Sequence, residues 1–243
     1  MAYTTIDNPE LYFQVKLYTG DNSSSQAQTL DGSENMSPDL VWIKSRNASH
    51  KNGWTDTVRG VTKTLHSGQA GSDRDEKTLA DGLTAFGANG FTVGNNDFCG
   101  AAVNYVAWCW KRGSVPAMDI VTWTGNGANR TLSHACGVKP SVMICKRRNG
   151  TDSWRMYHTS LGAEKYLTLN STAAPVTEAT IFNNTEPTSS VFTVSTDSSI
   201  NSSTNTYVAW LFSDVAGFCK SGTYIGNGNA ADGTFIYLGF KPS

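Results

Sequence analysis

The chain has 243 residues, of which 39% are hydrophobic and 16% charged, and its formal net charge is −1. This length and hydrophobic content suffice for one large or two small packed domains, while the small net charge and the lack of a long Lys/Arg run exclude an electrostatic footprint for nucleic acid or an anionic membrane surface. The short basic cluster at residues 146–148 is interpreted as a solvated strand end. With no run of about eighteen apolar residues and no signal-peptide pattern, we expect no membrane insertion and no signal-directed secretion.

Alternating side chains and enrichment in β-branched and aromatic residues predict strands throughout the chain. In chain order they cover residues 14–18, 39–45, 90–93, 105–110, 120–123, 142–146, 165–169, 180–182, 191–194, 207–212 and 234–239. The segments 39–45 and 105–110 are apolar on both faces, which is typical of central strands buried on two sides. No apolar repeat of 3.6 residues extends beyond a turn or two, so the fold class is predicted to be all-β.

Several phrases occur twice in the same order. Tyr-Val-Ala-Trp begins at Tyr105 and again at Tyr207, 102 residues later, and "SPDLVWIKSR" from Ser37 corresponds to "KPSVMICKRR" from Lys139. A third phrase, "TYIGNG" at residues 223–228, resembles "TWTGNG" at 122–127 and "LYTGDN" at 17–22. We therefore predict two tandem β-sandwich or jelly-roll repeats related by internal duplication, followed by the start of a third.

The repeat allows two domain boundaries. If the TGNG hairpin closes the unit before it, the domains are residues 1–137 and 138–243, which is the preferred division. The alternative division falls near residue 115, in the segment "RGSVPAMD". A third possibility is that both copies build a single sandwich.

The chemistry-bearing residues match no catalytic or metal template. The four His residues have no nucleophile elbow or HExxH motif around them and are interpreted as surface or strand-end residues, and the acidic segment 71–77 as an exposed charged loop. The five Cys residues show no CxxC spacing, which predicts neither a disulfide framework nor a zinc site and favours a reduced compartment. We expect no enzyme activity, no cofactor and no metal.

Two tryptophans are candidate ligand-binding residues. Trp54 and Trp154 lie in the polar stretches "NGWTD" and "DSWRM", and an exposed Trp on a β-sandwich can stack against sugar rings. The alternative interpretation is that each closes the rim of its own core, since Trp is highly buried on average.

Taken together, the phrases "PDLVWIKSR", "DTVRGVTKTL", "GFTVG", "YVAWCWK" and "YHTSLGAEKYLTLN" resemble an uncharacterised repeat domain of tailed bacteriophages, notably of marine and cyanobacterial hosts, in virion proteins often labelled tail fibre. The resemblance covers residues 12–243. It implies a non-enzymatic virion structural protein, synthesised in the host cytoplasm and displayed on the particle surface in a tail fibre or tail-associated appendage.

The resemblance leaves two alternatives open, a capsid decoration protein and a lectin-like module that binds host glycans. The partners it implies are other virion proteins of the tail or capsid and further copies of the chain in a homo-oligomer, with a trimer favoured. The lectin-like alternative adds a host surface glycan.

Overall fold

The computed structural model describes residues 4–68 and 75–241 and confirms the all-β prediction. The first half contains the 3-10 turn η1 (Pro9–Leu11) and the strands β1 (Phe13–Thr19), β2 (Gln26–Thr29), β3 (Leu40–Ser45), β4 (Gly53–Asp56), β5 (Lys63–His66), β6 (Lys77–Thr78), β7 (Leu83–Gly87), β8 (Gly90–Val93) and β9 (Asn104–Trp110). The second half contains β10 (Met118–Thr124), β11 (Arg130–Ser133), β12 (Val142–Arg147), β13 (Arg155–His158), β14 (Lys165–Thr168), β15 (Val176–Thr177), α1 (Ala179–Phe182), β16 (Val191–Val194), α2 (Ser198–Asn201) and β17 (Thr206–Phe212). No helix of the described part is long and apolar enough to cross a membrane.

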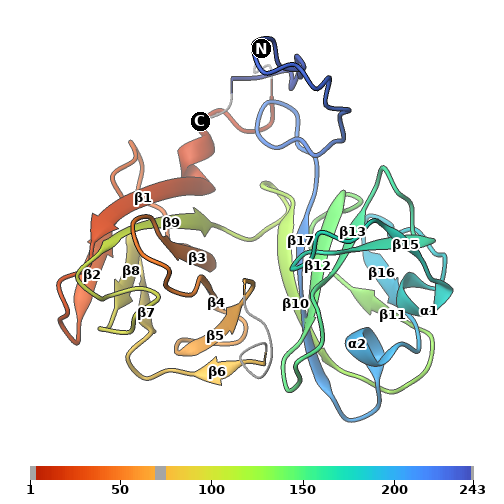
Figure 1. Ribbon diagram of the computed structural model, residues 1–243, viewed down its shortest axis with the longest axis horizontal. Helices are drawn as coiled ribbons and strands as arrows, with labels where there is room; N and C mark the ends of the chain where they lie inside the picture. Colours follow the sequence, from red (N-terminus) through yellow and green to blue (C-terminus); the bar gives the residue numbers. More distant parts are fainter. Residues whose placement is uncertain (1–3, 69–74, 242–243) are drawn as a thin grey trace.

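Both halves have the same strand order. The main sheet of the first half is ordered β1-β9-β3-β4-β5-β6, and that of the second is β10-β17-β12-β13-β14-β15. In each half a smaller sheet lies over this main sheet (Figure 1). Its strand order is β2-β8-β7 in the first half and β11-β16 in the second. In the second half the helix α1 stands at the place in the chain that β7 has in the first. The sheet order therefore repeats as the sequence does, while an origin by duplication stays a prediction.

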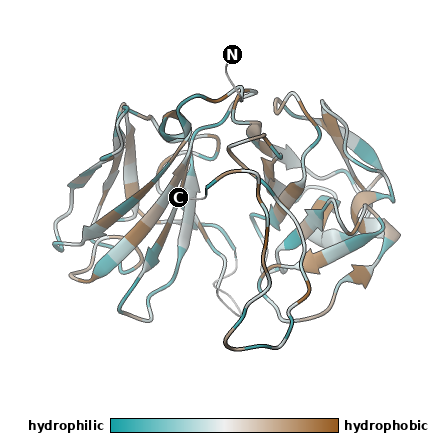
Figure 2. Ribbon diagram, turned by 90° about the horizontal axis from the view of Figure 1, so that it is seen from above, coloured by the Kyte–Doolittle hydropathy of each residue, from teal (hydrophilic) through white to brown (hydrophobic). Residues whose placement is uncertain are grey.

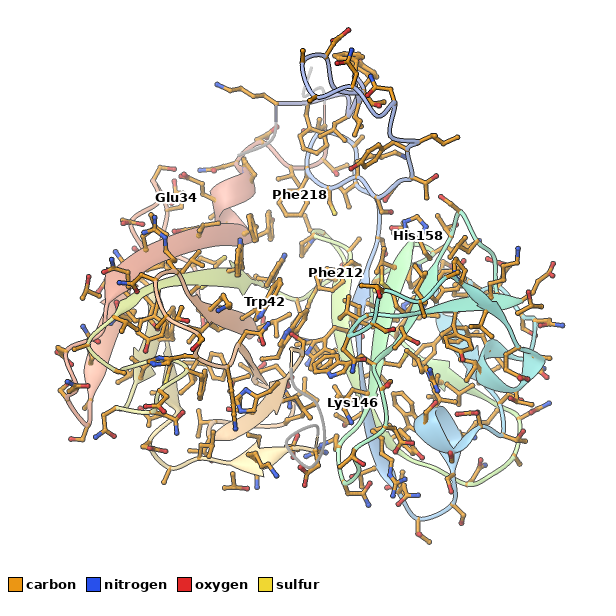
Figure 3. The ribbon with its side chains drawn as sticks, viewed as in Figure 1. Glu34, Trp42, Lys146, His158, Phe212 and Phe218 are labelled. Atoms are coloured by element: carbon orange, nitrogen blue, oxygen red, sulfur yellow. The ribbon has the colours of Figure 1, made fainter. Side chains whose placement is uncertain are left out.

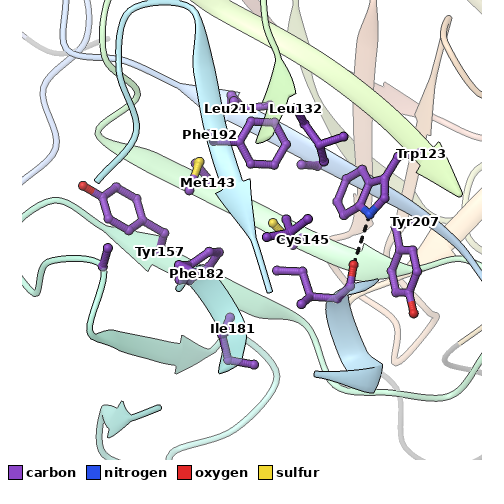
Figure 4. Close-up of a cluster of buried hydrophobic side chains, with 14 of the residues drawn as sticks. Trp123, Leu132, Met143, Cys145, Tyr157, Ile181, Phe182, Phe192, Tyr207 and Leu211 are labelled. Carbon is purple, nitrogen blue, oxygen red and sulfur yellow. Dashed lines mark hydrogen bonds between the residues drawn. The ribbon is translucent and has the colours of Figure 1, made fainter. Parts of the chain in front are cut away.

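Each half encloses its own core. In the first half the inward faces of β3, β8 and β9 supply Val41, Phe91 and Tyr105, all buried. The second half has a corresponding core of its own. In this core Trp123 donates its indole N–H to the carbonyl of Ile200 at 3.1 Å (Figure 4).

A third core joins the two main sheets face to face. It contains Leu40 from β3 together with Ile120, Val208 and Trp210 from the second half. Trp42 and Phe212, which lie between the halves in Figure 3, pack against its margin. The prediction that segment 39–45 is buried on both faces holds, because Val41 and Ile43 face the first core while Leu40 and Trp42 face the shared one. The main sheets are thus inner layers, with cores on both sides.

The strand pairing divides the chain between β9 and β10. β10 pairs with β17 along its whole length and β11 pairs with β16, although both precede Gly137. The TGNG hairpin therefore opens the second unit instead of closing the first. The pairing agrees with the alternative boundary near residue 115, and a division at 137/138 would separate paired strands.

Two predicted strands are wrong. Residues 180–182 lie in the short helix α1, whose first turn is capped by the Glu178 side chain and which ends at Asn183 with a left-handed φ of 54°. The adjacent Ile181 and Phe182 are both buried. In a strand with one exposed face, neighbouring side chains point to opposite faces and only one of the two would be buried. Residues 234–239 alternate as a strand would, but no described strand pairs with them.

Candidate functional site

The proposed sugar-binding tryptophans are not on the surface, and that prediction is corrected. Trp54 is 4% exposed and Trp154 is 0% exposed, and both belong to the shared core between the main sheets. Their ring centroids are 5.6 Å apart, with one Trp contributed by each half. The structure therefore brings the two residues together, but where no polysaccharide could stack on them.

Five tryptophans form a cluster across the boundary between the halves. Trp42 stacks on Trp54 at 4.9 Å and lies 4.6 Å from Trp108, while Trp210 stacks on Trp154 at 5.4 Å and lies 5.1 Å from Trp54. Offset and tilted ring pairs at these separations add stability beyond the area that they bury. The cluster holds the halves together.

Trp54 and Trp154 are not equivalent positions of the repeat. In the first half Trp54 pairs with Trp42 of β3, whereas the residue of β13 that pairs with the corresponding Ile144 is Met156. Trp154 precedes β13 and reaches the same core from the turn before it. The sequence alone could not show that both rings converge on one site.

A buried ion network crosses the same boundary. Arg59 and Asp56 have fully buried side chains and form a salt bridge at 2.6 Å, and Arg59 also contacts Glu76 at 3.1 Å. Glu76 binds Arg148 of the second half at 2.8 Å, and the Trp210 indole donates to Asp56 at 3.1 Å. Burial raises the pKa of Glu76, but hydrogen bonds and charges from Arg148 and Arg59 outweigh that effect and lower its pKa overall.

The structure corrects the sequence interpretations of the basic cluster at 146–148 and of the acidic segment 71–77. Lys146 is fully buried, and its ammonium donates to the carbonyls of Arg147 and Gly150, so the basic cluster at 146–148 is not a solvated strand end. Glu76 is 11% exposed, so the acidic segment is not wholly an exposed loop, although residues 71–74 lie outside the described part. Sequence gave no signal for either, because the partners are distant along the chain.

The histidines and cysteines are not grouped. Among the described residues no set of three or more His, Cys, Asp or Glu side chains could hold a metal ion. His66 and His158 are buried at the ends of β5 and β13, as expected for strand-end residues. All five Cys residues are free, and burial raises the pKa of Cys136 and of Cys145 to about 12, so both remain thiols at neutral pH.

The most exposed apolar surface lies after β17. We call residues 222–237 the C-terminal hairpin, because the chain reverses at the phrase "GNGNAADG" and the Thr234 hydroxyl donates back to the Ile225 carbonyl at 3.0 Å. Its five large apolar side chains range from 49% exposed at Ile236 to 89% at Ile225 and include Tyr224, Phe235 and Tyr237. Seen from above, the segment lies in front of the two halves and carries hydrophobic stretches (Figure 2).

An aromatic cavity lies where this segment leaves the body. It has a volume of about 220 Å³ at the end of the shared core, with Phe13, Trp110 and Phe212 among its lining residues. Phe218 also lines it and meets Tyr12 edge to face at 6.3 Å. The base of the C-terminal segment is therefore packed, while its hairpin extends into solvent. An apolar surface of this kind marks a site of interaction with another molecule.

The comparison with known families decides the affiliation of the chain. The model described as "Domain of unknown function (DUF7483)" matches residues 8–243. The chain belongs to the DUF7483 family. The DUF7483 match includes both halves and the C-terminal hairpin, so all three belong to one family unit. A search of curated proteins and a search of solved structures found no match.

Proposed function

We propose that the protein is a non-enzymatic structural protein of a bacteriophage particle, displayed on its surface as part of a tail fibre or tail-associated appendage. The observation that carries the proposal is the exposed apolar C-terminal hairpin beside a body whose halves are joined by a packed core. Such a body supplies a rigid unit, and such a hairpin supplies a surface for assembly. The sequence resemblance to phage virion repeats supports the location.

Cryo-electron microscopy of intact particles tests this proposal. Density for the protein on the tail is the expected result. Density on the shell would overturn the tail assignment and favour the capsid decoration protein, the alternative that suits a body in which the described residues form no long shaft. A protein absent from the particle would overturn both.

The lectin-like alternative loses the residues on which it rested. Trp54 and Trp154 are buried, so a glycan could reach them only if the halves separated. An array of host glycans tests this alternative. We expect that neither Trp54→Ala nor Trp154→Ala, in a protein that remains folded, removes any glycan binding shown by wild type.

A further inference from the structure

We propose that the C-terminal hairpin of one copy of this chain takes the place of the first hairpin, β1–β2, in a second copy, so that copies join head to tail by strand exchange. This inference deepens the proposed function, because it names the partner and the mode of assembly. It also accounts for two of the exposed apolar side chains of the hairpin, Tyr224 and Ile236, which would become buried.

The C-terminal hairpin shares two local features with the hairpins that are already seated, β1–β2 and β10–β11. In each, a side chain of the returning segment donates to a backbone carbonyl at the end of the outgoing segment. The three contacts are Gln26 to Thr19 at 2.9 Å, Arg130 to Thr124 at 3.1 Å and Thr234 to Ile225 at 3.0 Å. In each, the residue that opens the turn is left-handed, with φ of 60° at Asn22, 71° at Gly127 and 67° at Gly228. These shared contacts fix the register between the three hairpins.

In that register Tyr224 corresponds to an aromatic residue that stacks on the Tyr of the Tyr-Val-Ala-Trp strand. Tyr18 stacks on Tyr105 at 5.2 Å, and Trp123 stacks on Tyr207 at 5.4 Å. Tyr224 is instead 67% exposed. If Tyr224 takes the place of Tyr18, the ring on which it stacks is Tyr105 of a second copy of this chain.

The second strand shows why the first half can exchange its hairpin. Opposite Phe192, β11 places the buried Leu132, but opposite Phe91, β2 places Gln28. The Gln28 amide Nε2 is buried with no hydrogen-bond partner among the described residues. Ile236 occupies this position in the C-terminal hairpin. Exchange would replace an unsatisfied amide by an aliphatic side chain, a change that favours the incoming strand.

The position of β1–β2 makes it the replaceable hairpin. Both β1 and β2 are edge strands of their sheets, so they can leave without separating another strand pair, whereas β10–β11 is tied into the chain between β9 and β12. The C-terminal hairpin leaves β17 through a short β-bridge, Val215 with Cys219, like the bridge of Gly113 with Met118 that starts β10. It is thus presented as the opening hairpin of a unit.

A single glycine distinguishes the seated from the free hairpin. A Cβ at Gly20 would lie 2.0 Å from the Ala101 carbonyl oxygen, and one at Gly125 would lie 2.1 Å from that of Ser202. The corresponding Gly226 has no described atom within 4 Å of its Cβ position. A methyl group there is harmless while the hairpin is free and clashes once it is seated.

The test compares Gly226→Ala with Gly222→Ala by light scattering coupled to size exclusion, over a range of concentrations and after refolding from urea. Gly222 also has open space around it, but it corresponds to Lys16 and Val121, so a side chain at this position is accommodated in the seat. We expect wild type and Gly222→Ala to form oligomers. Gly226→Ala should raise the apparent dissociation constant about tenfold or more, with an unchanged melting temperature of the monomer.

Wild type that stays monomeric at every concentration, or Gly226→Ala that assembles as wild type does, would overturn the inference. A protein that is monomeric in solution would contradict strand exchange but not the location in the particle, which electron microscopy tests. The two proposals can therefore fail separately.

A mixing experiment identifies the contact. Leu17 pairs with Val106 in β9, and Thr223 corresponds to Leu17. When a Val106→Cys variant is mixed with a Thr223→Cys variant and oxidised, we expect a disulfide-linked peptide pair in mass spectrometry. Linkage that requires both cysteines in one chain would show exchange within a copy and would contradict head-to-tail joining.

Discussion

Trp210 is the residue on which the shared core depends most. Its side chain is fully buried, contacts the Trp residues of both halves and donates to Asp56, while Arg59 lies over its ring at 5.1 Å. We expect Trp210→Ala to lower the free energy of unfolding by about 3–5 kcal/mol, measured by urea denaturation. The half-buried Trp108 is the matched control, and its Ala variant should lose less. A Trp210→Ala protein with an unchanged urea midpoint would contradict this role.

Glu76 should give the protein a distinct acid sensitivity. Its pKa is held below the usual 4.5, so its ion pairs stabilise the folded state above that pH and are lost as the pH falls through the folded-state value. Glu76→Gln should be less stable at neutral pH and lose less stability between about pH 5 and pH 3. Melting temperatures across this range test the prediction.

The exposed Glu164 provides the control for this pH series. Glu164→Gln should follow the wild-type profile. A Glu76→Gln profile parallel to that of wild type would show that Glu76 contributes nothing to acid sensitivity.

The sequence could predict which residues of a strand share a face, but not what covers that face. The residues Asn, Gly, Thr and Asp around Trp54 in "NGWTD" make an exposed ring one interpretation and closure of the rim of its own core the other. The structure shows that one of those polar neighbours, Asp56, is itself buried, because Arg59 neutralises it. A charge compensated within the core looks in sequence like a charge in water, so polar neighbours do not predict that Trp54 is exposed.

At the scale of elements, β2 carries buried polar groups that lack hydrogen-bond partners among the described residues. It contributes Gln26 and Gln28, each with one such polar atom. Gln28→Leu should raise the free energy of unfolding by about 1–3 kcal/mol, because it removes an unsatisfied amide opposite Phe91. Thermal unfolding measures this gain.

Ala27 lies on the exposed side of the same strand and provides the control. Ala27→Leu should leave the melting temperature nearly unchanged. A destabilised Gln28→Leu variant would show that the site has no room for the larger branched group.

The hairpins show the limit of sequence patterns at this scale. The alternation of residues 234–239 resembles that of residues 191–194, and only the second segment is a strand. Residues 191–194 pair with β11, whereas no described strand pairs with residues 234–239. A strand is defined by its hydrogen-bonded partner. Local sequence therefore predicts that a segment can form a strand, but not whether a partner strand lies beside it.

At the scale of the whole molecule, the shared core should make unfolding cooperative. The halves are joined by buried tryptophans and by the Arg59, Glu76 and Arg148 network. We expect scanning calorimetry of a monomeric sample to show one transition, with a calorimetric enthalpy close to the van't Hoff enthalpy. Two resolved transitions would mean that the halves unfold independently.

The repeat in sequence predicted the number of units and left their arrangement open. Apolar residues on both faces of segments 39–45 and 105–110 required a second layer, and either a smaller sheet or the other half could have supplied it. The structure uses both, one on each side. The boundary depended on which unit owns the TGNG hairpin, and only strand pairing could assign it.

The central position of β17 has a consequence for isotope exchange. This strand is hydrogen-bonded to β10 on one edge and to β12 on the other, and it lies between the shared core and the second core. Its amide protons can meet deuterated water only when the whole molecule opens, so their exchange rates report the global free energy of unfolding. In a monomeric sample, protection of Val208, Ala209 and Trp210 measured by mass spectrometry should therefore match the calorimetric stability, while amides of the C-terminal hairpin exchange within the first time point.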